Sequence, residues 1–122
     1  MSTVTVSTQV NPIGTKLVYD SDADATAADN TTGETGILYM VEVDNTGNAF
    51  VVYFKMADTT DATVGTTAAG LVLMVPASTK MSFAFPTGIT FSAGFSHWCT
   101  KLAAESDTTD PAANVAVRYI TT

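Results

Sequence analysis

Hydrophobic and polar residues alternate along most of this chain, and that alternation predicts an all-β protein. The segment TVTVSTQV at residues 3–10 alternates strictly, while apolar residues with helical spacing are nearly absent. β-Branched residues, which fit a pleated sheet, are common throughout. The pattern predicts eight or nine short strands, at residues 3–10, 15–20, 36–45, 49–57, 70–76, 79–86, 88–92, 93–101 and 114–122.

The spacing of these strands is typical of a β-sandwich or a β-barrel. Turn residues separate them: Asn45-Thr46-Gly47-Asn48 predicts a hairpin, and Pro86 with Gly88 predicts the end of one strand and a tight turn. Longer loops are expected at residues 20–36, 57–70 and 103–112. No repeat and no linker divides the 122 residues, so we expect a single domain spanning residues 1–122.

The same alternation predicts which side chains face the core. In the segment 49–57 the inward residues are expected to be Phe50, Val52, Phe54 and Met56, and the outward ones Val51, Tyr53 and Lys55. In the strand from residue 36, one face is expected to hold Ile37, Tyr39, Val41 and Val43. Leu38 and Met40 are apolar too, which indicates that the first half of that strand is covered on both sides. In the last strand the inward residues are expected to be Val115, Val117 and Tyr119.

The chain is acidic but sparsely charged. Its formal net charge is −7 and its sequence pI is about 4.2, which argues against nucleic-acid binding and against docking on a membrane of anionic lipid. Only 14% of the residues are charged and 46% are apolar, so we expect part of the surface to be covered by a protein partner. No signal peptide and no membrane-spanning apolar run are expected from the sequence.

The only histidine, tryptophan and cysteine are neighbours in sequence, at His97, Trp98 and Cys99. His97 and Cys99 are two apart on one strand face, roughly 6–7 Å from each other, which is too far for a nucleophile pair. One histidine and one cysteine cannot complete a zinc site. We therefore expect a packed or partner-facing His97. Trp98 lies on the opposite face, where a place in the core is favoured over a groove for a sugar or a partner.

The segment Asp20-Ser21-Asp22-Ala23-Asp24 begins like a calcium-binding loop. The rest of an EF-hand is missing, because Ala25 stands at the position of the turn glycine and Thr31 at that of the bidentate glutamate. A solvated acidic loop is the default interpretation. The alternative is an irregular calcium site formed by Asp20, Asp22, Asp24 and Asp29. The sequence has no nucleophile elbow and no phosphate-binding glycine loop, so we expect neither an enzyme nor a cofactor.

From residue 36 to residue 120 the chain runs through a distinctive order of segments. GILYMVEVDN is followed by a YFK strand, a VGTT turn, the strand LVLMVP, the segment KMSFAFPTGITFSAG and the final strand VAVRYI. This order resembles that of small virion structural proteins of tailed bacteriophages. The resemblance implies an antiparallel β-sandwich, often jelly-roll-like, that serves as a part of the particle. Capsid decoration or cement subunits and tail-associated subunits both belong to this class.

The resemblance implies a capsid decoration or cement protein that binds the major capsid protein and stabilises the shell. The protein would be located in the virion, which is assembled in the host cytoplasm. A tail- or fibre-associated virion subunit is one alternative. An alternative of another class is a carbohydrate-binding β-sandwich module, in which Trp98, Tyr53 or Tyr39 would form a stacking platform. Low charge and many apolar strands favour the virion subunit.

Residues 1–11 are expected to form an N-terminal strand or arm, which Asn11-Pro12 separates from the domain. Such an arm can add to the sheet edge of another copy through main-chain hydrogen bonds. The predicted partner-binding residues are Thr3, Val4, Thr5 and Val6 in the arm and the outward-facing Val51 and Tyr53. A closed ring such as a trimer is expected, because closure leaves no open sheet edge.

Overall fold

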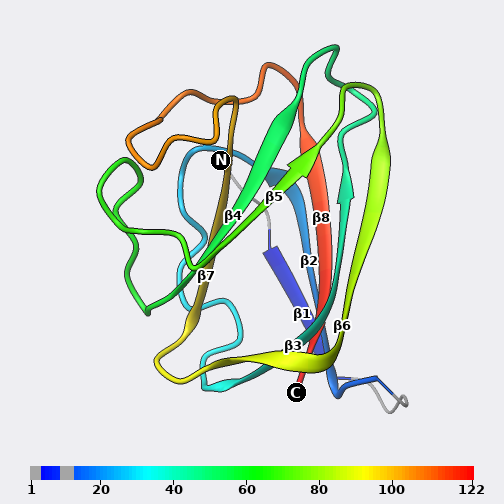
Figure 1. Ribbon diagram of the computed structural model, residues 1–122. Coiled ribbons are helices and arrows are strands. Elements are labelled where there is room, and N and C mark those ends of the chain that lie inside the picture. The colour runs from blue at the N-terminus through cyan, green and yellow to red at the C-terminus, as the bar shows by residue number, and fades with distance from the viewer. Residues whose placement is uncertain (1–3, 9–12) are drawn as a thin grey trace.

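The chain is described by a computed structural model, in which residues 4–8 and 13–122 are placed. These residues form eight strands and no helix. The strands are β1 (Val4–Thr8), β2 (Lys16–Ala23), β3 (Gly36–Asp44), β4 (Val52–Asp58), β5 (Leu71–Val75), β6 (Lys80–Phe91), β7 (Phe95–Thr100) and β8 (Val115–Thr121). All of their pairings are antiparallel. They make two sheets that pack face to face, which confirms the expected all-β sandwich (Figure 1).

The connections between the two sheets run as in a jelly roll. One sheet has the strand order β1-β2-β8-β3-β6 and the other has the order β5-β4-β7. The segment 24–31 between β2 and β3 lies along the free edge of β7, where Ala28 forms an isolated antiparallel bridge with His97. It takes the place of an eighth jelly-roll strand, and β1 is an additional strand at the edge of the larger sheet. The expected jelly-roll-like arrangement is therefore confirmed.

The core lies between the two sheets, where every second residue of a strand points inward. Its fully buried side chains include Val18, Leu38, Val41, Val43, Phe54, Phe91, Phe95, Val117 and Tyr119. In β8 the predicted inward residues Val115, Val117 and Tyr119 are all buried. Because β8 lies between β2 and β3, it is integral to the five-stranded sheet. A side chain of this size stabilises the fold by roughly 1.5–3 kcal/mol when it is fully buried.

The facing predicted for the first half of β3 is wrong. The pairing of β3 with both of its neighbours shifts register between Leu38 and Met40. Against β8 the extra residue lies in β3, whereas against β6 the extra residues lie in β6, between Ala84 and Ile89. The extra residue in β3 reverses the side on which the preceding residues point. Leu38 is therefore fully buried, whereas Tyr39 is only half-buried.

Residues 79–86 and 88–92 were expected to be separate strands, but β6 is continuous from Lys80 to Phe91. Pro86 is tolerated because β6 is the edge strand of its sheet, so the missing N–H does not break a ladder on both sides. Gly88 has a φ of 76°, and a Cβ at this position would lie 2.2 Å from the Ile37 side chain. Both residues shape the strand without ending it.

The predicted loop at residues 20–36 is shorter than expected. β2 continues to Ala23, and the following segment is held to β7 by backbone hydrogen bonds. The N–H of Cys99 donates to the carbonyl of Asp24 over 2.8 Å, and the N–H of Thr31 donates to the carbonyl of Phe95 over 2.9 Å. A solvated loop is therefore the wrong description of residues 20–31. The sequence missed this because the partner strand is more than 60 residues away.

Candidate functional site

A chain of four hydrogen-bonded side chains crosses the interior of the sandwich. Asp20 Oδ2 lies 2.7 Å from His97 Nε2, and His97 Nδ1 lies 3.0 Å from the Tyr119 hydroxyl. That hydroxyl lies 2.5 Å from the hydroxyl of Thr31. Asp20 and His97 are fully buried and Tyr119 is 1% exposed. The chain connects β2, β7, β8 and the segment that follows β2.

Aromatic rings surround this network and hold it in place. The Tyr119 ring stacks on Phe95 with centroids 4.4 Å apart, and the Phe54 ring stacks on His97 at 5.7 Å. Each side chain reaches the interior because its strand alternates: Asp20 follows the inward Val18, and Tyr119 follows the inward Val117. A buried carboxylate without a partner would be costly, so His97 and Asp20 stabilise one another's position.

The network is closed to solvent, which decides its chemistry. Burial raises the pKa of the Tyr119 hydroxyl well above its ordinary value, so this group stays protonated and donates a hydrogen bond. With Asp20, His97 and Tyr119 all buried, no substrate can touch their reactive atoms. The network of Asp20, His97 and Tyr119 therefore connects the two sheets through side-chain hydrogen bonds. The expectation of a packed His97 is confirmed. The sequence did not indicate that Asp20 and Tyr119 are its partners.

Cys99 shares the inward face of β7 and is also fully buried. Burial, with smaller contributions from the negative charges of Asp20 and Asp24, raises the pKa of its thiol. A protonated and buried thiol is a poor nucleophile. Cys99 therefore behaves as a small apolar core residue in this structure.

The acidic residues considered for an irregular calcium site form hydrogen bonds with different partners. Asp20 is held by His97, Asp24 Oδ1 accepts a hydrogen bond from the Thr26 N–H, and Asp29 Oδ1 accepts one from the Ala62 N–H. Within residues 4–8 and 13–122, no group of three or more His, Cys, Asp or Glu side chains is arranged to hold a metal ion. The structure does not bring Asp20, Asp22, Asp24 and Asp29 together.

Trp98 is 1% exposed and lies on the outer face of the three-stranded sheet. It packs with Ala57 and Ala62 beneath the loop at residues 59–70, which covers that face (Figure 1). The expected buried position is confirmed, although Trp98 belongs to a separate outer cluster and not to the core between the sheets. A buried indole cannot stack on a sugar, so Trp98 cannot serve as the platform of a carbohydrate-binding module.

Lys55 lies on the outer face of β4, as its outward position predicted. The loop at residues 101–107 nevertheless covers it, and only 1% of Lys55 is exposed. Its Nζ donates to the carbonyl of Ala104 over 2.8 Å. Desolvation lowers the pKa of Lys55, while the negative charge of Asp107 opposes this shift. Strand alternation predicts only the face, and a loop distant in sequence decides its burial.

The predicted partner-binding residues lie on two different sheets. β1 pairs with β2 of its own chain, with Val4 opposite Asp20 and Val6 opposite Val18. Thr5 is exposed and Val6 is 43% exposed, so this strand presents an accessible edge; Thr3 and residues 9–11 lie outside the described residues. Val51 and Tyr53 are half-buried beside and within β4. The structure therefore does not bring the arm and β4 into one surface.

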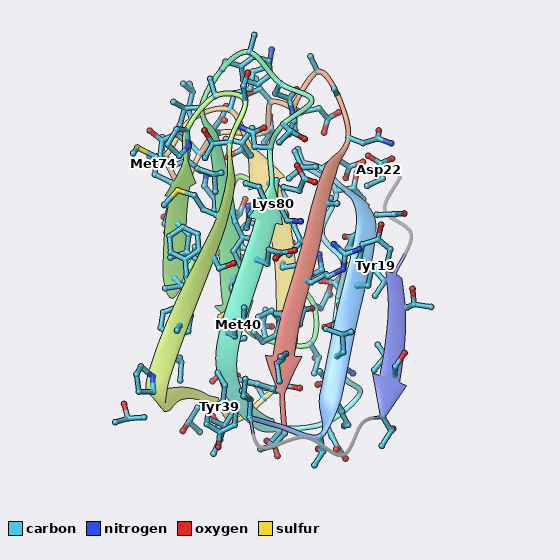
Figure 2. The ribbon with its side chains drawn as sticks, turned by 90° about the vertical axis from the view of Figure 1, so that its right-hand side faces the viewer. Tyr19, Asp22, Tyr39, Met40, Met74 and Lys80 are labelled. Carbon is cyan, nitrogen blue, oxygen red and sulfur yellow. The ribbon has the colours of Figure 1, made fainter. Side chains whose placement is uncertain are left out.

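On the outer face of the five-stranded sheet, Met40 was expected to be covered, but the sequence did not indicate that the whole face forms one surface. Figure 2 shows this face with Tyr19, Met40 and Lys80 on it. Glu42 lies at its centre, 3.6 Å from Lys80 and 3.5 Å from Arg118, and the Arg118 guanidinium lies 4.3 Å from the centre of the Tyr19 ring. Below these charges the face is apolar.

The apolar half of this face is hollowed on both sides of Met40. A groove of about 370 Å³ is lined by Ile13, Tyr39, Met40, Ala84, Phe85 and Pro86. A smaller recess of about 130 Å³ is lined by Leu17, Met40, Glu42, Arg118, Tyr119 and Ile120. A sequence signal for this face existed in Leu17, Met40 and Ile120, which are apolar at outward positions. We refer to this surface, formed by the outward residues of β2, β8, β3 and β6, as the sheet face.

Comparison with known protein families, curated proteins and solved structures finds no match to this chain. The described residues contain no helix that is long and apolar enough to cross a membrane.

Proposed function

We propose that this protein is a structural subunit of a tailed-phage virion, a capsid decoration or cement protein that binds the major capsid protein through its sheet face. The observation that carries the proposal is the contrast between the sheet face and the rest of the surface. The sheet face is broad, apolar in one half and balanced in charge in the other. The remaining surface is acidic, and the side chains of Asp20, His97 and Tyr119 are buried.

The charge balance can be counted on the four strands that form this face. Apart from the buried Asp20, they carry three carboxylates and three basic side chains, which sum to zero: Asp22, Glu42, Asp44, Lys16, Lys80 and Arg118. The other nine of the twelve carboxylates and the other two of the five basic side chains account for the whole net charge of −7. A neutral face on an acidic protein can approach another protein without long-range repulsion. Exposed apolar patches of this kind typically mark protein-binding surfaces.

The structure weakens the carbohydrate-binding alternative, because Trp98 is buried, and the other two expected platform residues, Tyr39 and Tyr53, are half-buried. A tail- or fibre-associated subunit would use the same surface against a different virion protein. Locating the chain by cryo-electron microscopy of the whole particle distinguishes the two positions. Density for this chain on the capsid surface supports decoration, and density on the tail supports the alternative.

A matched pair of variants tests whether the sheet face makes the contact. Ala84 is exposed on β6 at the rim of the large groove, and Ala112 is exposed in the loop before β8. Ala84→Lys places a charge in the apolar half and should lower the number of copies bound per particle, whereas Ala112→Lys should leave it unchanged. Equal binding by both variants and the wild type would show that this face does not bind the particle.

The arm remains a second proposed contact, between copies of the subunit. In this structure β1 completes the sheet of its own chain, so joining two copies through the arm requires exchange of β1 between them. Such an exchange would link the subunits into a ring such as the trimer expected from the sequence. Removal of residues 1–11 should then reduce the mass of the assembly while the sandwich still melts cooperatively.

A further inference from the structure

Among the described residues the sandwich has four edge strands, and two of them carry features that oppose pairing with another chain. The edge of β7 is covered by the segment 24–31. The edge strand β6 carries Lys80 and Pro86. The third edge strand, β1, has no such feature, but three of the five side chains in its sequence VTVST are polar. Charged residues, prolines and covering segments are the usual means by which natural sheets prevent edge-to-edge association.

The fourth edge strand, β5, has none of these features. Its sequence is LVLMV, and among the described residues it pairs only with β4. Val72 is 43% exposed and Met74 is 52% exposed on its outer side. No bulge interrupts the β4–β5 register. An apolar, regular and uncovered edge is a template for another strand.

Apolar side chains extend from this edge into the open side of the sandwich. Leu71 and Leu73 on β5 are half-buried, as are Phe83 and Phe85 on β6. Figure 2 shows Met74 at the side of the molecule next to β6. A strand added to β5 would therefore gain both main-chain hydrogen bonds and apolar contact.

We infer that β5 joins two copies of this chain, with β5 of one copy paired antiparallel to β5 of the other across a two-fold axis. The charge distribution favours a second copy as the occupant. Residues 62–79, which include β5, contain no charged side chain, so two chains of net charge −7 can meet at this segment without close contact between like charges. The pairing creates one continuous six-stranded sheet in the order β7-β4-β5-β5-β4-β7.

Full overlap of the two five-residue strands fixes the register. Leu73 then lies on the two-fold axis, and Val72 lies directly opposite the partner's Met74. This contact is independent of the virion proposal and of the arm. It produces a dimer, whereas exchange of the arm produces a ring such as a trimer. The tests of the virion proposal and of the arm can therefore fail while the β5 contact holds, and the reverse is also true.

The first experiment compares two single substitutions by sedimentation velocity over a range of concentrations. Met74→Lys places a charge at the proposed joint, and Leu102→Lys is its control, because Leu102 is 58% exposed in the loop that follows β7, the strand at the opposite edge of the same sheet. Both side chains already face solvent, so thermal melting should stay close to that of the wild type. The wild type and Leu102→Lys should dimerise alike, and Met74→Lys should dissociate at least about tenfold more readily.

The second experiment tests the register with cysteines. Val72→Cys and Met74→Cys chains are prepared separately, mixed and oxidised; Cys99 does not interfere because it is buried. Directly opposite Cβ atoms come within reach of a disulfide, so the mixture should give mainly the disulfide that joins one chain of each kind. Any of three results would overturn the inference. The wild type could stay monomeric at every concentration, Met74→Lys could dimerise as well as Leu102→Lys, or the mixed disulfide could fail to form.

Discussion

Tyr119→Phe removes one oxygen from the buried network and leaves the ring in place. The phenylalanine ring can keep the stacking contact with Phe95, whose centroid lies 4.4 Å away. Two contacts are lost, the one to His97 Nδ1 at 3.0 Å and the one to the Thr31 hydroxyl at 2.5 Å. The substitution therefore isolates the contribution of the hydroxyl from that of the apolar packing.

The expected loss of stability follows from what remains unpaired. His97 is fully buried, so its Nδ1 atom loses its only hydrogen-bond partner in a site that water does not reach. An unsatisfied buried polar group costs about 1–3 kcal/mol, and a lost neutral hydrogen bond costs about 1 kcal/mol. Thr31 is partly exposed and can bond to water instead. We expect a decrease of about 2–4 kcal/mol in the free energy of unfolding, which lowers the melting temperature by roughly 10 °C.

Urea denaturation followed by the fluorescence of Trp98, the only tryptophan, measures this change. The slope of the unfolding free energy against urea should match that of the wild type, because the substitution exposes no new surface on unfolding. Tyr19→Phe is the control, since Tyr19 lies on the outer sheet face under Arg118. A Tyr119→Phe variant as stable as Tyr19→Phe would refute the claim that the network ties the two sheets together.

Three further predictions follow from the loops and the core. The N–H groups of residues 92–94 donate hydrogen bonds to the Asp58 carboxylate, and the bond from Ser92 contributes most to lowering the pKa of Asp58. Asp58→Asn should therefore reduce stability at pH 7, and melting curves recorded at decreasing pH should show the stability difference from the wild type shrinking below about pH 4. The thiol of Cys99 should react with a disulfide reagent only as fast as the protein unfolds, since burial raises its pKa; rapid labelling in native buffer would contradict this. The amides of Ala28 and Thr31 should exchange slowly with deuterium, because each donates to a β7 carbonyl over 2.9 Å; exchange as fast as in a free peptide would show that this segment is detached.

Local pattern predicted much of the fold, because strand alternation is a property of adjacent residues. The inward positions of β4 and β8 could be predicted, because Phe54 and Tyr119 each belong to a run in which every second side chain is apolar. Strand spacing predicted a sandwich or a barrel, and the resemblance over residues 36–120 implied a jelly-roll-like sandwich. Trp98 was expected to be buried, but the loop at residues 59–70 is what covers it. The inward facing of β4 and β8 does not depend on which distant segment lies opposite.

The tertiary structure alone decided the features that depend on distant partners. Asp20 and His97 are 77 residues apart in sequence, and no local pattern indicates that β2 and β7 face each other at that point. Lys55 looks like a solvent-facing residue until the loop at residues 101–107 folds over it. The bulge near Tyr39 reverses half of a strand because β6 and β8 set its register. Sequence alternation thus determines that a residue faces one side of a sheet, whereas long-range packing determines what covers that side.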